Sequence, residues 1–116
     1  MEVNQQDKLL VLWTSPDREV ALKMAFMYTK NSKLKGWWDE VKLLVWGPSA
    51  KLLAEDQELQ AYVKVMMDTG IEVFACKACS DRYGVSDILE GLGVNVFFVG
   101  ERFTELLKSD WKVLSL

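Results

Sequence analysis

Short apolar runs alternate along the chain with longer segments in which apolar residues recur every three or four positions. Five runs have the length and composition of β-strands, and they cover residues 8–13, 41–46, 73–76, 95–99 and 112–114. The first run is almost continuously apolar, which is typical of a strand covered on both faces. Because strands and helices alternate strictly, the pattern predicts an α/β fold with a mainly parallel sheet between layers of helices.

The periodic segments predict a helical connection after each of the first four strands, over residues 17–31, 49–69, 80–92 and 101–109. A break is expected near Asp56 in the second connection, and a restart at Gly84 in the third. Ser49 and Ser86 are the expected caps of the helices that they precede. We see no linker or internal repeat, and 116 residues suit one domain, 1–116.

The composition narrows the function classes. Half of the residues are hydrophobic and 27% are charged, as in a folded globular protein. The formal net charge of −3 gives no positive field for nucleic acid or anionic lipid, so neither is an expected partner. No run approaches the roughly 20 apolar residues of a membrane span, and the polar segment 1–8 does not have the pattern of an export signal. A cytoplasmic protein is therefore expected.

Two cysteines carry the candidate chemistry, Cys76 and Cys79, at the boundary between the third strand and its helix. Histidine is absent, which excludes every site within the chain that needs an imidazole. A thiol that faces a helix start is near free N–H groups and the positive end of the helix dipole, which lower a thiol pKa. Taken alone, Cys76 is most simply interpreted as a small buried hydrophobe at the end of an apolar strand.

The spacing of the two cysteines supports a reactive pair, since thiols three residues apart across such a turn can come within disulfide reach. A structural zinc ion would need two more ligands, from carboxylates or another subunit, and we expect neither a metal nor a cofactor.

Other candidate site residues follow from the topology. The carboxyl ends of parallel strands meet at one edge of the sheet, where ligands bind in α/β proteins. This edge is expected to collect substrate-binding groups from the segments after the first three strands: Thr14, Ser15, Gly47, Ser49, Lys77 and Arg82. The two basic residues would stabilise a thiolate or an incoming anion, or would be solvated surface charges, with Asp81 partly cancelling them.

Several short motifs, in the same order, resemble the DsrE/DsrF-like sulfur-relay family. The clearest is the segment 75–85, in which Cys76 is followed by Arg82 and the Gly84-Val85 pair at the family's spacing. The turn at 45–49, the segment 70–73 and the ending 111–114 are also similar, so the resemblance covers nearly the whole chain.

The resemblance implies a three-layer α/β/α sandwich with a five-stranded, mainly parallel sheet. It implies a homo-oligomer, with a trimer or hexamer favoured over a dimer. It also implies that Cys76 carries sulfane sulfur as a persulfide between donor and acceptor proteins. Family members do not generally have a cysteine at the position of Cys79, so that residue either resolves the persulfide, forms a disulfide or packs.

Three hypotheses therefore compete. The first is a sulfur carrier or transferase that uses Cys76. The second is a dithiol redox protein, related to peroxiredoxins, that cycles through a Cys76–Cys79 disulfide. The third is a non-catalytic oligomeric interaction module whose cysteines only pack.

Overall fold

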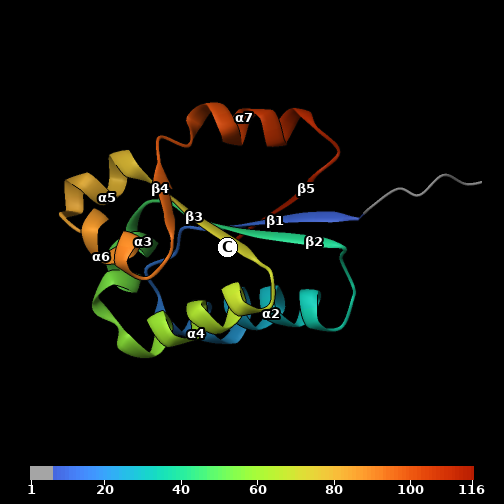
Figure 1. Ribbon diagram of the computed structural model, residues 1–116, viewed down its shortest axis with the longest axis horizontal. Helices are drawn as coiled ribbons and strands as arrows, with labels where there is room; N and C mark the ends of the chain where they lie inside the picture. The colour runs from blue at the N-terminus through green and yellow to red at the C-terminus, as the bar shows by residue number, and fades with distance from the viewer. Residues whose placement is uncertain (1–6) are drawn as a thin grey trace, which may run out of the picture.

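Five parallel strands form one sheet in the computed structural model, which describes residues 7–116 (Figure 1). The strands are β1 (Lys8–Trp13), β2 (Glu40–Val45), β3 (Glu72–Cys76), β4 (Asn95–Phe97) and β5 (Lys112–Ser115), in the spatial order β4-β3-β2-β1-β5. Every neighbouring pair is parallel, which confirms the predicted α/β fold. Residues 1–6, which include most of the segment examined for an export signal, lie outside the described residues.

Helices connect the strands in the predicted places. They are α1 (Arg18–Val20), the π-helical turn η1 (Ala21–Ala25), α2 (Phe26–Leu34), α3 (Pro48–Glu55), α4 (Gln57–Asp68), α5 (Lys77–Tyr83), α6 (Ser86–Gly91) and α7 (Gly100–Lys108). The break at Asp56 is confirmed, because its carboxylate accepts a hydrogen bond from the Leu59 N–H and caps α4. The restart is also confirmed: Gly84, at φ +71°, ends α5 in the left-handed conformation.

Two predicted caps and two helix boundaries are wrong. Gly47 and Val85 are the N-caps of α3 and α6, and the hydroxyls of Ser49 and Ser86 bind elsewhere. Ser49 Oγ donates to the Trp13 carbonyl at 2.6 Å, and Ser86 Oγ donates to the Asp81 carboxylate at 2.5 Å. The first helical connection runs to residue 34 instead of 31, because α2 continues after η1. The third helical connection begins at Lys77 instead of residue 80, because α5 follows β3 directly, with Cys76 as its N-cap.

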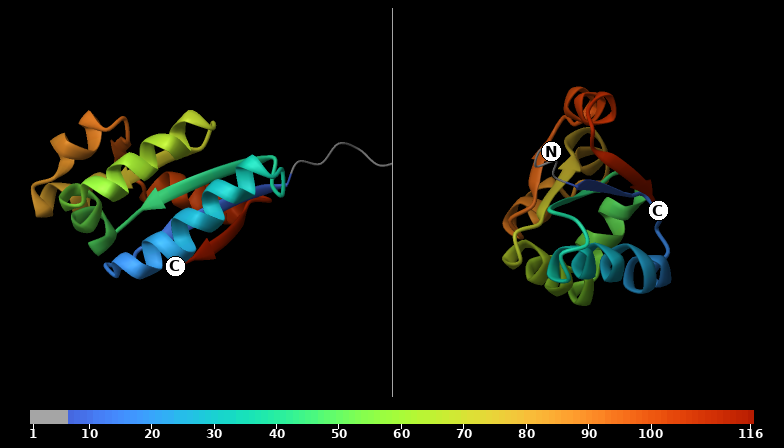
Figure 2. Two further views of the ribbon diagram at one scale, coloured as in Figure 1. Left: turned by 90° about the horizontal axis from the view of Figure 1, so that it is seen from below. Right: turned by 90° about the vertical axis from the view of Figure 1, so that its right-hand side faces the viewer.

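The strand order decides which face of the sheet each helix covers. From β1 to β4 each strand lies beside the one before it, so right-handed crossovers place the first three helical connections on the same face. The connection from β4 to β5 runs back across the whole sheet, and its helix α7 lies on the opposite face (Figures 1 and 2). One face therefore carries a layer of helices, and within residues 7–116 the helix α7 is the one that covers the other face.

Each face has its own apolar core. The larger cluster joins β1 to β3 to the helix layer and includes Trp13, Phe26, Leu43 and Leu53, all fully buried. The smaller cluster lies under α7 and consists of Leu10, Leu44, Phe74, Cys76, Val99 and Leu106. Side chains alternate between the faces along each strand, and this alternation directs Phe74 and Cys76 of β3 to the α7 side.

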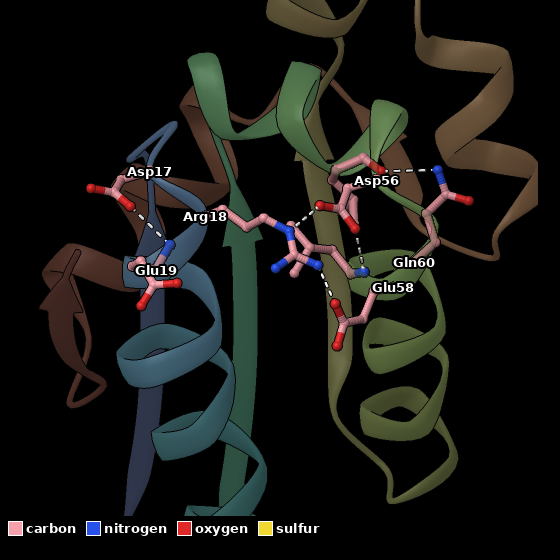
Figure 3. A network of polar contacts seen from close by, with 8 residues as sticks. Asp17, Arg18, Glu19, Asp56, Glu58 and Gln60 are labelled. Atoms are coloured by element: carbon pink, nitrogen blue, oxygen red, sulfur yellow. Dashed lines mark hydrogen bonds and ion pairs between the residues drawn. The ribbon is translucent and has the colours of Figure 1, made fainter.

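A polar network fixes the start of the first helical connection against the junction of α3 and α4 (Figure 3). Arg18 Nε donates to Asp56 Oδ2 at 2.6 Å, and its guanidinium also pairs with Glu58. Hydrogen bonding to Arg18 holds the pKa of the Asp56 carboxyl below its usual range. Gln60 Nε2 donates to the carbonyls of Leu53 and Ala54 at 3.0 Å, which closes the end of α3. The network keeps the loop after β1 in a fixed position beside α3.

Candidate functional site

Cys76 is the last residue of β3 and lies where the helical connections diverge. The connection after β3 packs on the larger cluster through Val85 and Leu89, whereas the connection after β4 packs on the smaller cluster through Leu106. Adjacent strands whose connections leave on opposite faces form a crevice at their carboxyl ends, which is the usual ligand position in open α/β sheets. The sequence predicted this edge of the sheet, and the strand order places Cys76 at the point of divergence.

The two thiols are neighbours because of their positions in α5. Cys76 is the N-cap, with extended φ and ψ of −75° and 119°, and Cys79 is the third residue of the helix. Side chains at these two positions lie against each other, as they do in a capping box. Both cysteines are free and both pack in the smaller cluster, Cys76 with 6% of its surface exposed and Cys79 half-buried.

The thiol of Cys79 lies between Cys76 and the end of β2. Burial raises the pKa of the Cys79 thiol, and the neighbouring sulfur of Cys76 raises it further. Hydrogen bonding from the Gly47 backbone and from the Trp46 side chain acts in the opposite direction. Gly47 has φ +79° and ψ −143°, a conformation that is essentially restricted to glycine and that directs the chain past this thiol.

Aromatic side chains surround the thiols on the α7 side. Trp46 packs edge-on against Phe103 of α7, with ring centroids 5.1 Å apart. Phe97 of β4 stacks on Phe74 of β3, with centroids 5.6 Å apart and planes inclined by 13°. These rings belong to the cluster that contains Cys76, so they limit the access of water to its sulfur. The sequence analysis did not select Trp46 or Phe103; the only signal was that Trp46 precedes the Gly47-Pro48 turn.

Of the predicted basic residues, Lys77 is paired within its own helix. Its Nζ lies 3.1 Å and 3.2 Å from the two carboxylate oxygens of Asp81, and 5.9 Å from the ring centroid of the exposed Phe98. The hydroxyl of Ser86 and the Lys77 ammonium lower the pKa of Asp81. Lys77 is thus directed toward solvent and Asp81, and Arg82 is exposed on the same helix.

The remaining predicted residues lie at different distances from the thiols. Gly47 follows β2, the strand next to β3, and its backbone reaches Cys79. Thr14 and Ser15 follow β1, two strands away from β3, a separation of about 10 Å at the usual strand spacing. Their N–H groups donate to the Leu116 carbonyl at 2.9 and 3.2 Å. Ser49 is fully buried, with its hydroxyl bound to backbone carbonyls.

Two grooves on the surface are lined by other residues. One, of about 400 Å³, lies on the carboxyl edge of the sheet between Pro16, Pro48 and Tyr83. The other, of about 430 Å³, lies between the first helical connection and β5 and includes Met24, Met27 and Trp37 among its lining residues. Neither is lined by Cys76 or Cys79, so neither contains the two thiols.

The described residues contain neither a metal-binding cluster nor a membrane-spanning helix. Within residues 7–116, no group of three or more His, Cys, Asp or Glu side chains is arranged to hold a metal ion. None of the helices described in that range has the length and apolar content that a membrane crossing requires.

Comparison with known proteins places this geometry in context. The model of the DsrE/DsrF-like family matches residues 7–116. A conserved protein of unknown function from Bacteroides thetaiotaomicron, BT1422, has 39% sequence identity and a TM-score of 0.92, over 95% of each chain. The ychN protein from E. coli has a similar fold, with a TM-score of 0.68 at 19% identity, over 97% of this chain and 100% of its own. The search of curated proteins gave no match.

Proposed function

Because the chain belongs to the DsrE/DsrF-like family, we propose that it is a sulfur carrier that accepts sulfane sulfur as a persulfide on Cys76. The observation that supports this role most directly is the position of Cys76. It ends β3 at the point where the connections diverge, and a second thiol lies beside it in the same cluster. A carrier needs a nucleophilic sulfur in a site shielded from water, and the geometry is suited to both requirements.

The loading step is an exchange between sulfur atoms. The Cys76 thiolate attacks the outer sulfur of a donor persulfide, the donor's sulfur–sulfur bond breaks, and the donor cysteine leaves as a thiolate. The first N–H groups of α5 have no acceptor within the helix, and the Cys76 side chain makes no capping hydrogen bond to them. A charged sulfur at this N-cap would supply that acceptor, so the step needs no histidine base.

Persulfide-selective labelling followed by mass spectrometry tests the proposal. The reduced protein is exposed to sodium polysulfide, and the position of the added sulfur is mapped for the wild type, Cys76→Ser and Cys79→Ser. We expect Cys79→Ser to gain sulfur on Cys76. If Cys76 gains no sulfur in any of these proteins and resists alkylation in the native state, the interaction-module hypothesis replaces this one.

The adjacency of two free thiols also supports a second candidate, a dithiol redox protein. In that case Cys76 and Cys79 form a reversible disulfide with a defined reduction potential. Titration against dithiothreitol redox buffers measures that potential. A chain that cycles through the disulfide would lose all turnover in Cys79→Ser, whereas a carrier would still load sulfur on Cys76 in this variant.

We further propose that the carrier is a cytoplasmic homo-oligomer, a trimer or hexamer, that meets separate donor and acceptor proteins. Reduced thiols require a reducing compartment. Self-association is supported by the incomplete cover of the α7 side and by large apolar side chains left exposed, among them Phe98 at 66% and Leu34 at 58%. Light scattering coupled to gel filtration measures the subunit number, and a monomer at micromolar concentration would contradict this part of the proposal.

A further inference from the structure

The two thiols of the site differ in how far solvent can reach them. Cys76 exposes 6% of its surface, under Val99 and Leu106, whereas Cys79 is half-buried and lies against Trp46 at the surface of the cluster. A folded acceptor protein must bring its own thiolate into line with a sulfur–sulfur bond, which requires open space on one side of the attacked sulfur. The buried sulfur of Cys76 does not offer this space, and Cys79 does.

We infer that Cys79 is a second sulfur carrier within the same site: protein donors and acceptors exchange sulfane sulfur with Cys79, and the sulfur moves between Cys79 and the buried Cys76, so that the donor persulfide from which Cys76 loads is the one on Cys79 or a small polysulfide. This inference rests on the proposed function and adds the route by which sulfur leaves. It assigns storage to the buried thiol and exchange to the half-buried one, three residues further along α5.

The transfer balances without an external oxidant or reductant. The Cys79 thiolate attacks the outer sulfur of the Cys76 persulfide, and a bond forms between this sulfur and Cys79 Sγ. The bond from the same sulfur to Cys76 Sγ breaks, and Cys76 leaves as a thiolate that takes up the proton released by Cys79. One thiol and one persulfide are present before and after the step, so no atom is oxidised or reduced overall.

The surroundings of the two cysteines favour storage of sulfur on Cys76 and its later transfer to Cys79. The N-cap and third positions of a helix bring their side chains together without a change in the backbone. Phe74 and Leu44 belong to the same buried apolar cluster as Cys76, and this cluster separates a stored persulfide from dissolved thiols. Burial raises the pKa of Cys79, so its thiolate fraction at a given pH is lower than that of a free cysteine, and this slows premature transfer.

The test compares acceptors of different size. Wild type and Cys79→Ser are loaded with sodium polysulfide and freed of excess reagent. Each is then mixed with cyanide, a small acceptor, or with reduced thioredoxin, a folded protein acceptor. Ala78→Ser is the matched control, since it adds a hydroxyl to the same helical turn at an exposed position and keeps both thiols. Cys79→Ala replaces Cys79→Ser if the latter does not fold.

We expect Cys79→Ser to keep its sulfur on Cys76 and to react with the small acceptor cyanide at nearly the wild-type rate. Its transfer of sulfur to thioredoxin should be slower by roughly tenfold or more, because a folded acceptor reaches the buried sulfur only after local opening. Ala78→Ser should match the wild type with both acceptors. Wild-type rates for Cys79→Ser with thioredoxin would overturn the inference, as would a Cys76–Cys79 disulfide with release of sulfide. Failure of Cys76 to load in every protein would instead overturn the proposed function.

Discussion

Removal of the Leu106 side chain tests whether α7 controls access to the thiols. α7 is the single helix on the thiol side of the sheet, and Leu106, at 2% exposure, is its buried anchor in the smaller cluster. Leu106→Ala deletes three carbon atoms from a closely packed position. Such changes lower the free energy of unfolding by about 2–5 kcal/mol, part of it from the cavity that remains. For a chain of this size the expected decrease in Tm is roughly 10 °C.

The packing lost in Leu106→Ala should also make the Cys76 thiol more accessible. If α7 detaches locally before the sheet unfolds, each ~1.4 kcal/mol of lost anchoring raises the open population tenfold. Alkylation of Cys76 by iodoacetamide, measured under native conditions in a Cys79→Ser background, should therefore accelerate by roughly tenfold or more. Urea unfolding in the same background gives the accompanying loss of stability.

Leu107→Ala is the matched control, because it makes the same substitution at the next position of the helix, where the side chain is 54% exposed. Its effect on the free energy of unfolding should stay within about 0.5 kcal/mol. Equal labelling rates of Cys76 in the two variants would refute the role of α7 as the cover of the thiol.

Three further predictions concern other parts of the structure. Gly47→Asn should lower the free energy of unfolding by about 1–3 kcal/mol, because asparagine does not tolerate the φ and ψ of residue 47. Gly84→Asn should lower it by less than about 1 kcal/mol, because asparagine tolerates the left-handed conformation of residue 84. Urea unfolding compares the two variants, and equal losses of stability would contradict the argument. The rate of alkylation of Cys79 should increase with pH through a midpoint above that of a free thiol, since burial raises the pKa of Cys79. Glutathione, alkylated in parallel, supplies the free-thiol midpoint, and a lower midpoint for Cys79 would contradict the prediction. Because the pKa of Asp56 is lowered in the folded state, its ion pair with Arg18 stabilises the fold above the usual carboxyl range of about pH 4, and this contribution is lost as the pH falls through the lowered pKa. Arg18→Gln should therefore reduce stability at pH 7 and have little effect near pH ~2. A loss of stability that is independent of pH would show that Arg18 acts through packing.

Much of the fold could be predicted because its signals are local. The apolar run of β1, the acid that caps α4 and the glycine that ends α5 each act within one or two turns of their own position. The boundary between β3 and α5 is local in the same sense, so the position of the cysteine pair was predictable. The π-helical turn η1 was not predicted, since the apolar spacing around it fits an ordinary helix.

The wrong predictions concern residues whose neighbours are set by strand pairing between distant parts of the chain. Ser49 has the sequence position of a cap, but the Trp13 carbonyl, brought close by the pairing of β1 with β2, binds its hydroxyl instead. Thr14 and Ser15 have the right loop position, but the strand order leaves β2 between them and Cys76. The alternation of strands and helices fixes which edge of the sheet a loop joins, and it does not fix which loops are neighbours along that edge.

The same strand order accounts for the contrast between the two cysteines. Because only the last connection crosses the α7 side, one helix must cover five strands, and it covers the apolar half near the carboxyl ends, where Cys76 lies. The amino half of this face is polar instead: Lys42 pairs with Glu72 and lies 5.2 Å from the ring centroid of Trp111. A single covering helix can bury Cys76, which is 6% exposed, but it leaves Cys79, three residues further along the chain, at its margin. A buried thiol beside a half-buried one is therefore a consequence of the topology, and the two proposed roles, storage and exchange, correspond to these two positions.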